Sequence, residues 1–341
     1  MAGYARTSKM VLEYQETIPH SPITVKQLYA DACASDEITI STWAEQWLAQ
    51  TKANKEKYGS FKANSLGTLY GKYRHSACII AGSGTSLENN IEILKNNRKT
   101  VPLISCLHNF SYFADNGIVA DYYVTLDAGA VTISEISEGG KKTHDEYLEA
   151  TKGSTLLAFI GTHPDLLKAW RGKVLFFNAP IPDKPLADKI QEVENFGVFV
   201  SNGGNVLGAC LYIAKAIFGC NPIAFVGADF CFSYDNRFHP QPSQYDGKLG
   251  GYLKVTDVFG NMVRTWQSYN NFKKWFDYIA QTVPGIYINC SEGGTFGAYY
   301  NGNIQDVIQM PLVKFLEGFT LFEHIRSQCE NPESNERILL F

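Results

Sequence analysis

Short apolar runs that alternate with helical patterns dominate the chain from residue 76 onward, and they constrain its fold more than any other feature. The runs lie at residues 77–81, 101–106, 122–126, 155–160, 174–177, 223–226 and 286–288. Continuous apolar strands separated by helices are typical of a parallel sheet that is buried on both faces. The sequence therefore predicts an α/β fold whose ligand site lies at the carboxyl ends of the strands, beside the point where the strand order reverses.

Residues 1–72 lack this alternation. Thr24 with Gln27, and Thr42 with Glu45, have the spacing of a capping box, so we expect two helices to start there. We interpret the region as a helical segment that packs on the main domain or serves oligomerisation.

The composition is that of an ordinary globular protein, with 45% hydrophobic residues, 19% charged residues and a net charge of -4. Broad nucleic-acid binding needs a concentrated basic face, so this charge argues against it. The eight cysteines include no CxxC pair, which favours reduced, buried thiols over a zinc site or disulfides.

No apolar run approaches the roughly 18 residues that span a bilayer, and residues 1–10 lack the apolar core of a secretory signal. We therefore expect a cytoplasmic protein with no membrane partner.

A glycine-rich segment joins the first apolar run to the helical pattern that follows it. Its residues are Gly82, Ser83, Gly84, Thr85 and Ser86. Glycines let the backbone approach a ligand closely, and the free N–H groups at a helix start attract phosphate. The segment is not a P-loop, because no Gly-Lys-Ser/Thr follows. The alternative is a tight turn in which Thr85 caps the helix and Glu88 completes a capping box.

A second turn of this kind follows the apolar residues 198–200. Its residues are Ser201, Asn202, Gly203 and Gly204, with Asn205 opening the next helix. Two such turns at strand ends suggest a ligand with phosphate and sugar parts that spans neighbouring strands. The alternative is that one turn is structural and the other functional.

Two aspartates stand at the ends of predicted strands: Asp127 after residues 122–126, and Asp229 after residues 223–226. A carboxylate there can hold a ribose hydroxyl, a metal-bound pyrophosphate or a reacting hydroxyl, and it can also cap a helix. His239 lies in an irregular loop ten residues after Asp229. Because imidazole suits proton transfer near neutral pH, we take Asp127, Asp229 and His239 as the candidate catalytic residues.

Further polar residues at strand ends are candidates for donor binding. They are His108 and Asn109 after the second apolar run, and Asn289, Ser291 and Glu292 on a glycine-flanked turn after the last. An amide, a hydroxyl and a carboxylate on one turn suit the recognition of a nucleobase or a sugar, although a plain surface turn is the alternative. The chain has no G-x-S-x-G elbow, which disfavours nucleophilic catalysis.

Taken in order, these motifs resemble those of one family. The matching segments are residues 81–87 with Asn90 and Ile91, 119–127, 201–206, 219–230 and 288–294, with His239 matching a later histidine. The chain resembles the flagellar motility accessory factors and the archaeal MptE-like 6-hydroxymethylpterin diphosphokinases. This resemblance implies a sialyltransferase-type nucleotide-binding fold and, from the motility accessory factors, transfer of nonulosonic acids from CMP-sugars to flagellin. Thr85 and Ala228 stand where the family has proline and glutamine.

We therefore expect the chain to divide into three segments. They are a helical N-terminal segment (1–72), a Rossmann-like nucleotide-binding catalytic domain with a mostly parallel sheet and helices on both faces (73–305), and a C-terminal helical tail (306–341).

Motifs and resemblance together predict a glycosyltransferase that uses a nucleotide-activated sugar, in first place a CMP-linked donor of the nonulosonic acid type. The acceptor is a hydroxyl of an undetermined protein, glycan, lipid or modified nucleic acid. One alternative is an ATP-dependent pyrophosphokinase that resembles the hydroxymethylpterin enzymes, with Mg²⁺ on Asp127 or Asp229. Another is a nucleotide-binding accessory protein without catalysis. No other cofactor is expected, the sequence defines no metal site, and homo-oligomerisation is left open.

Overall fold

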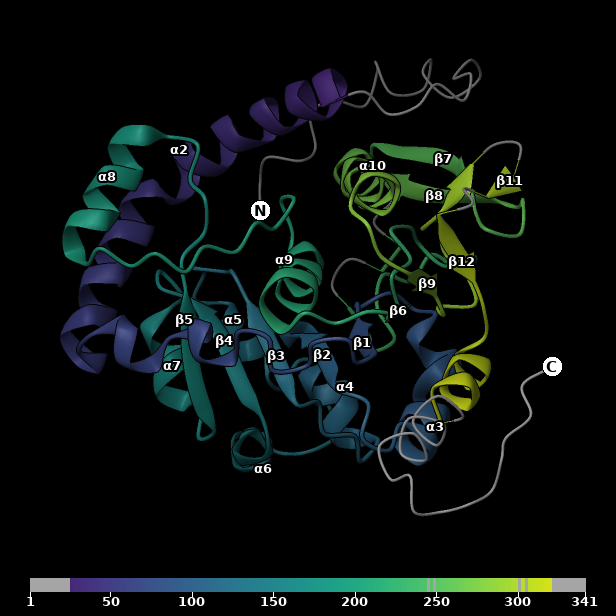
Figure 1. Ribbon diagram of the computed structural model, residues 1–341, viewed down its shortest axis with the longest axis horizontal. Coiled ribbons are helices and arrows are strands. Elements are labelled where there is room, and N and C mark those ends of the chain that lie inside the picture. Colours follow the sequence, from purple (N-terminus) through teal and green to yellow (C-terminus); the bar gives the residue numbers. More distant parts are fainter. Residues whose placement is uncertain (1–24, 244–245, 248–249, 300–301, 304–305, 321–341) are drawn as a thin grey trace, which may run out of the picture.

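An eight-stranded, entirely parallel sheet forms the centre of the protein in the computed structural model, which describes residues 25–243, 246–247, 250–299, 302–303 and 306–320 (Figure 1). In spatial order the strands are β12 (Val307–Gln309), β9 (Tyr287–Asn289), β6 (Ile223–Val226), β1 (Cys78–Ala81), β2 (Leu103–Cys106), β3 (Tyr122–Thr125), β4 (Thr155–Phe159) and β5 (Lys173–Phe177). Every residue of the central strands β6, β1, β2 and β3 is buried, which explains their continuous apolar sequence. The predicted α/β class with a parallel sheet is confirmed.

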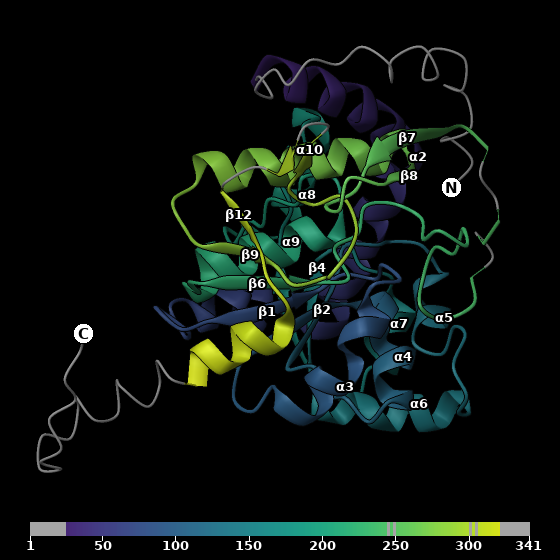
Figure 2. The same cartoon turned by 90° about the vertical axis from the view of Figure 1, so that its right-hand side faces the viewer.

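Helices cover both faces of the sheet, as the view in Figure 2 shows. On one side lie α9 (Val206–Tyr212) and α10 (Gln267–Thr282), and on the other lie α3 (Leu87–Asn97), α4 (Phe110–Asp115) and α6 (His144–Ala150). The remaining short helices are α5 (Thr132–Glu135), α7 (Pro164–Ala169) and α8 (Lys184–Val193). Short 3-10 turns lie at η2 (Phe61–Asn64), η3 (Leu66–Leu69), η4 (Leu107–Asn109) and η5 (Thr151–Gly153), and a π-helical segment, η6 (Ile213–Phe218), continues α9.

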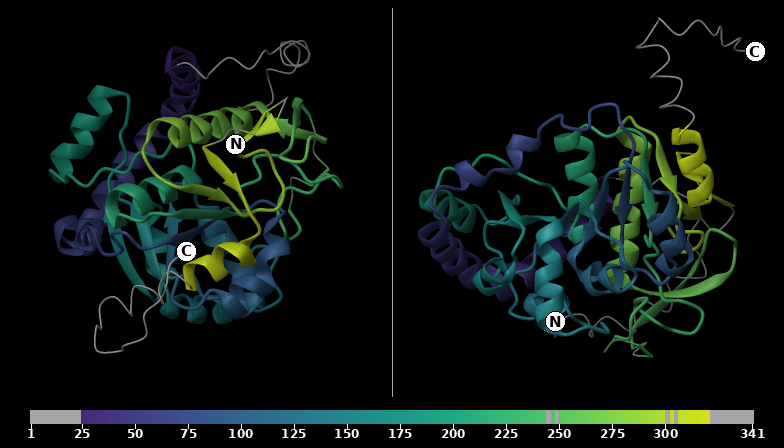
Figure 3. Two further views of the ribbon diagram at one scale, coloured as in Figure 1. Left: turned by 45° about the vertical axis from the view of Figure 1, so that its right-hand side comes forward. Right: turned by 90° about the horizontal axis from the view of Figure 1, so that it is seen from below.

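One long helix, α2 (Val25–Tyr58), replaces the two helices predicted in the N-terminal region. The capping-box pattern at Thr42 was misleading, because no glycine or proline interrupts residues 25–58 and Thr42 lies inside the helix. The helix ends at Tyr58 and is followed by Gly59, whose φ of +70° suits the residue after a helix C-terminus. Beside α8, it lies along the β5 side of the sheet (Figures 1 and 3).

Two small antiparallel pairs stand outside the main sheet. The hairpin of β7 (Tyr252–Thr256) and β8 (Met262–Trp266) follows the loop that carries His239. The second pair is β10 (Ala298–Tyr299) with β11 (Gly302–Asn303). A helix at 312–320 follows β12. The division of the chain at residues 72 and 305 stays a prediction.

Within the described residues, no helix combines the length and the apolar character that crossing a bilayer requires.

The strand order reverses between β1 and β6. The chain runs from β1 outward to β5 and then returns to place β6 on the other side of β1. Just beyond the strands, the N–H of Gly82 donates to the carbonyl of Val226 (2.9 Å) and that of Gly84 donates to the carbonyl of Gly227 (2.9 Å). A Cβ on Gly82 would lie 2.4 Å from the Gly227 carbonyl oxygen, so only glycine permits this approach.

We expect Gly82→Ala to lower the free energy of unfolding by about 2–3 kcal/mol, because its methyl group would meet backbone that cannot rotate away. Gly197→Ala is the control, since an added Cβ there meets nothing within 4 Å. Its stability should stay within about 0.5 kcal/mol of wild type. Urea denaturation of the three proteins measures the differences, and equal stability of both variants would contradict the packing argument.

Candidate functional site

A cavity of about 600 Å³ lies at the carboxyl ends of β1, β2 and β3, where the strand order predicts a ligand site. The sheet side contributes Gly82, Ser83 and Gly84 after β1, His108 after β2, and Asp127 after β3. The opposite wall is aromatic and comprises Phe238, Trp266, Tyr269 and Phe272. The cavity therefore combines an apolar face with polar groups at strand ends, the usual composition of a small-molecule site.

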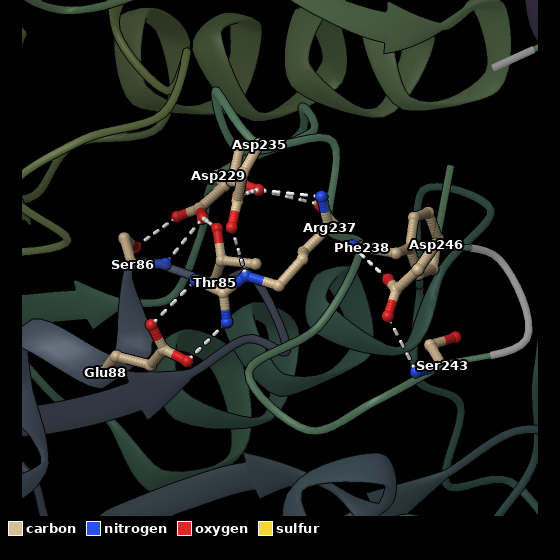
Figure 4. Close-up of polar contacts among 10 residues, drawn as sticks. Thr85, Ser86, Glu88, Asp229, Asp235, Arg237, Phe238, Ser243 and Asp246 are labelled. Carbon is tan, nitrogen blue, oxygen red and sulfur yellow. Dashed lines mark hydrogen bonds and ion pairs between the residues drawn. The ribbon is translucent and has the colours of Figure 1, made fainter. Parts of the chain in front are cut away.

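Asp229 reaches across the β1–β6 crevice and caps the start of α3, as Figure 4 shows. Its carboxylate accepts hydrogen bonds from the backbone N–H of Ser86 (2.9 Å), from the Ser86 hydroxyl and from the Thr85 hydroxyl (3.4 Å). Burial raises the pKa of Asp229, while these three donors oppose the rise. The helix start that the sequence offered to a phosphate thus already holds a carboxylate of the protein itself.

Gly84 is required by this contact, because a Cβ there would lie 2.4 Å from the Asp229 carboxyl carbon. The alternative capping box of Thr85 and Glu88 is wrong, since Glu88 instead forms an ion pair with Arg237 (2.6 Å; Figure 4). The amides of Gly82 and Gly84 are bonded to the β6 side, whereas the amide of Ser83 has no bonding partner among the described residues.

The second predicted turn does not reach the cavity. Asn202 accepts a hydrogen bond from the Gly204 amide (2.8 Å), and Gly203 packs against the ring of Trp275 in α10. Asn205 is the first residue of this region that borders the cavity, and its side-chain oxygen accepts a hydrogen bond from the Gly208 amide (2.8 Å) as the cap of α9. Of the two turns, the structure therefore brings only the first to the cavity.

The predicted donor-binding residues behind the cavity bond to the backbone of the protein. Asn109 is fully buried and donates to the carbonyl of Gly82 (2.9 Å), which fixes the glycine-rich segment. Asn289 donates to the Phe296 carbonyl, and the Ser291 hydroxyl accepts from the Ala228 amide. These three side chains and Glu292 do not line the cavity. Whether any of them contacts a donor stays a prediction.

His239 and His108 pack ring against ring at the cavity wall, with centroids 4.0 Å apart. Nδ1 of His239 donates to the carbonyl of Ser83 (2.7 Å), because a carbonyl oxygen can only accept. Burial lowers the pKa of His239 to about 4, and burial together with His239 lowers the pKa of His108 to about 3. Both rings are therefore neutral at pH 7. Nε2 of His239 carries a lone pair that no described residue engages.

Three contacts hold the loop that carries His239. Arg237 is anchored to α3 through Glu88, and the Phe238 amide donates to Asp246 (2.9 Å; Figure 4). On the far side of the histidine, the Gln241 side chain donates to the carbonyl of His108 (3.0 Å). His239 is only 8% exposed as a result.

Carboxylic acids form the third part of the cavity wall. Asp127 was predicted from its place at a strand end, whereas Glu135 and Glu138 were missed because they sit in an unremarkable polar segment. Burial, and then the nearby Asp127 and Glu138, raise the pKa of Glu135 to about 8, and burial raises that of Glu138. Oε2 of Glu138 lies 4.0 Å from Nδ1 of His108. In the described part of the chain, no lysine or arginine lines the cavity.

Helix α2 supports this wall from outside. The side-chain amides of Gln46 and Gln50 each donate to the carbonyl of Ala128 at 2.9 Å. The next amide along the chain, that of Gly129, donates to Asp127 (3.0 Å). The N-terminal helix thus fixes the turn that carries Asp127, a role that the sequence did not reveal.

Comparison with known proteins places the chain in a family. The family model described as 6-hydroxymethylpterin diphosphokinase MptE-like matches residues 50–235. A solved structure of a MAf glycosyltransferase from Magnetospirillum magneticum AMB-1 has the same fold, with a TM-score of 0.55 and 17% sequence identity. The similarity covers 83% of this chain and 42% of that one, so this chain spans less than half of the other protein. A search of curated proteins finds no match.

Acidification should destabilise the protein through His239. When unfolded, the imidazole takes up a proton near its ordinary pKa of 6.5, but when folded it does so only near pH 4. Its stabilising contribution is therefore complete above that ordinary value and declines as the pH falls. Relative to His239→Gln, wild type should lose about 1.4 kcal/mol of unfolding free energy per pH unit between about pH 6.5 and 4.5.

Urea denaturation at several pH values tests this expectation. His144→Gln, which removes an exposed histidine, is the matched control and should keep the pH dependence of wild type. If the curves of wild type and His239→Gln run parallel, His239 is not held neutral by the fold.

Proposed function

Because the chain belongs to the MptE-like family, we propose that it is a transferase that acts on a nucleotide-activated donor in the cavity beyond β1, β2 and β3. The family description names a diphosphokinase, and the similar structure is that of a glycosyltransferase. Both reactions move a group away from a phosphate-bearing donor. We favour glycosyl transfer from a CMP-linked sugar of the nonulosonic acid type to a hydroxyl acceptor.

The observation that carries this proposal is the imidazole of His239, which lines the cavity with Nδ1 bonded to the Ser83 carbonyl and with Nε2 engaged by no described residue. The acceptor oxygen would attack the anomeric carbon of the sugar while the bond from that carbon to the phosphate oxygen breaks. The nucleotide leaves with the electron pair of that bond, and the acceptor proton passes to Nε2 of His239. We assign the base to His239 and not to Asp229, because both oxygens of Asp229 are already engaged at α3.

The Ser83 end of the cavity, where we place the donor, is suited to a leaving group with a small negative charge. Ser83 offers one unengaged backbone N–H, and the described lining supplies no cationic side chain. A leaving group with a single phosphate needs less compensation than the triphosphate of ATP. The faces of Tyr269 and Trp266 provide an apolar surface for a base or a sugar ring.

A pyrophosphokinase is the second candidate, favoured by the family description. Such an enzyme uses Mg²⁺ to bind ATP. Asp127 and Asp229 are the predicted ligands, but Asp229 caps α3, and the described residues contain no group of three histidine, cysteine, aspartate or glutamate side chains placed to hold a metal ion. The fit is poor, and we derive no step through Mg²⁺.

Nucleotide binding separates these candidates. CMP at about 100 times its Kd should raise the stability of the full chain by about 2.7 kcal/mol, because it binds only the folded state. A thermal-shift series with CMP, CDP, UDP, GDP and ATP, each with and without Mg²⁺, measures the effect. A shift with ATP and Mg²⁺ but none with CMP would reverse our order of candidates.

Replacing the proposed base should separate catalysis from binding. We expect His239→Gln to slow the release of CMP from CMP-N-acetylneuraminate by about 10²- to 10⁴-fold, with the affinity for CMP unchanged. His144→Gln should react at the wild-type rate. Normal binding without turnover in both wild type and His239→Gln would favour the non-catalytic accessory protein.

A further inference from the structure

Three of the four carboxylic acids that line the cavity gather at one end of it, and the fourth, Asp229, lies at the other end with both oxygens hydrogen-bonded at the start of α3. Asp127, Glu135 and Glu138 all follow β3, whereas the glycine-rich segment follows β1. These two strands are separated by β2, so their ends lie about 10 Å apart, which is two strand spacings. His108 follows β2 and lies between the two ends, with the His239 ring packed against it at an interplanar angle of 39°.

Unpartnered polar groups beside the acids point independently to a ligand. His239 is more than nine-tenths buried, lines the cavity and presents an Nε2 that no described residue engages. Nε2 of His108 is also buried without a partner in the described structure. A buried acceptor without a donor costs free energy, and a ligand with O–H or N–H groups would recover it.

The charge of each substrate decides whether the donor or the acceptor can bind at the end of the cavity that holds Asp127, Glu135 and Glu138. The phosphate of the donor, and the carboxylate that a nonulosonic acid carries, would meet Asp127 and Glu138 with no lysine or arginine in the described lining to compensate. Like charges in a buried site repel strongly, because the dielectric screening is weak. The anionic donor therefore belongs at the Ser83 end, where Asp229 is the one lining acid and both of its oxygens are already engaged by Thr85 and Ser86. The end with three acids is left to the other substrate.

We propose that Asp127, Glu135 and Glu138 form the acceptor subsite, and that this subsite selects a glycan with hydroxyl or ammonium groups and rejects acidic glycans. The inference rests on the proposed glycosyl transfer. Asp127 and Glu138 accept hydrogen bonds from such a ligand, while Glu135, protonated at neutral pH, both donates and accepts. The acceptor hydroxyl then lies beside the histidine pair, where its proton has to go.

The wall is built to keep these acids in place. Gln46 and Gln50 of α2 fix the carbonyl of Ala128, and the Thr132 hydroxyl donates to the carbonyl of Gly129 (2.7 Å) at the start of α5. On the other side, the Ser111 hydroxyl donates to the carbonyl of Glu138 (2.6 Å). Side chains of α2, α4 and α5 thus fix the backbone that carries the three acids, which makes a preorganised site for hydrogen-bond donors supplied by a ligand.

The test uses the full chain saturated with CMP and three methyl glucosides that differ only at C6, which carries a hydroxyl, an amino group or a carboxylate. NMR or calorimetric titration at pH 7 should show the carboxylated glucoside binding at least about tenfold more weakly than the amino one, with the hydroxyl form between. The double variant Glu135→Gln/Glu138→Gln, which keeps Asp127, should reduce the affinity ratio between the two charged ligands. Glu317→Gln, an exposed acid outside the cavity, should keep the wild-type ratio.

The single variant Glu138→Gln provides a second reading if the double variant fails to fold, and it should reduce the ratio in the same direction. Equal binding of the three glucosides, tighter binding of the carboxylated one, or no binding of any of them to the CMP-loaded protein would overturn the acceptor subsite. These results would leave the donor assignment standing. Failure of CMP itself to bind contradicts the proposed function, and the acceptor subsite falls with it.

Discussion

The site depends on the close approach of two backbone segments where β1 and β6 end. Gly82 and Gly227 touch there because neither carries a side chain, and Asp229 crosses the same gap to cap α3. The contact fixes the backbone of Ser83, whose carbonyl in turn holds the imidazole of His239. A constraint on sheet packing thus determines where the proposed base stands. At the point where the strand order reverses, the backbone after β1 therefore holds the Ser83 carbonyl group in a fixed position.

Burial, and not ion pairing with basic residues, reduces the charge of the side chains that line the cavity. Burial keeps His108 and His239 neutral and keeps Glu135 protonated at neutral pH, so the wall carries fewer charges than its composition suggests. A bound phosphate near Ser83 would add negative charge close to His239 and raise the pKa of its ring. The imidazole then becomes a stronger base when the donor is present than when it is absent. In the proposed reaction, donor binding and proton transfer would therefore be coupled through electrostatics.

The sequence predicted the parts of the fold that local patterns encode. Short apolar runs located every strand of the main sheet except β12, because fully buried parallel strands leave a continuous hydrophobic signal. The cap formed by Asp229 on Ser86 was beyond prediction, since it joins residues 143 positions apart. Along α10, Tyr269 and Phe272 line the cavity while Phe276, further along the same helix, is fully buried. Periodicity identifies the apolar face of a helix but not whether a cavity lies against part of it.

The family match divides the cavity in a way that bears on specificity. Residues 50–235 include the glycine-rich segment, the three acids and Asp229, but they stop short of His239 and of the aromatic wall. The sheet side of the cavity is therefore what the chain shares with the MptE-like family, whereas the opposite wall comes from β8, α10 and the loop before them. A planar base or sugar ring would contact that wall, while phosphate and acceptor would contact the sheet side. In the proposed reaction, the groups placed on the sheet side therefore lie within the family match, whereas Phe238, Trp266 and Tyr269, which would contact the nucleotide base, lie outside it.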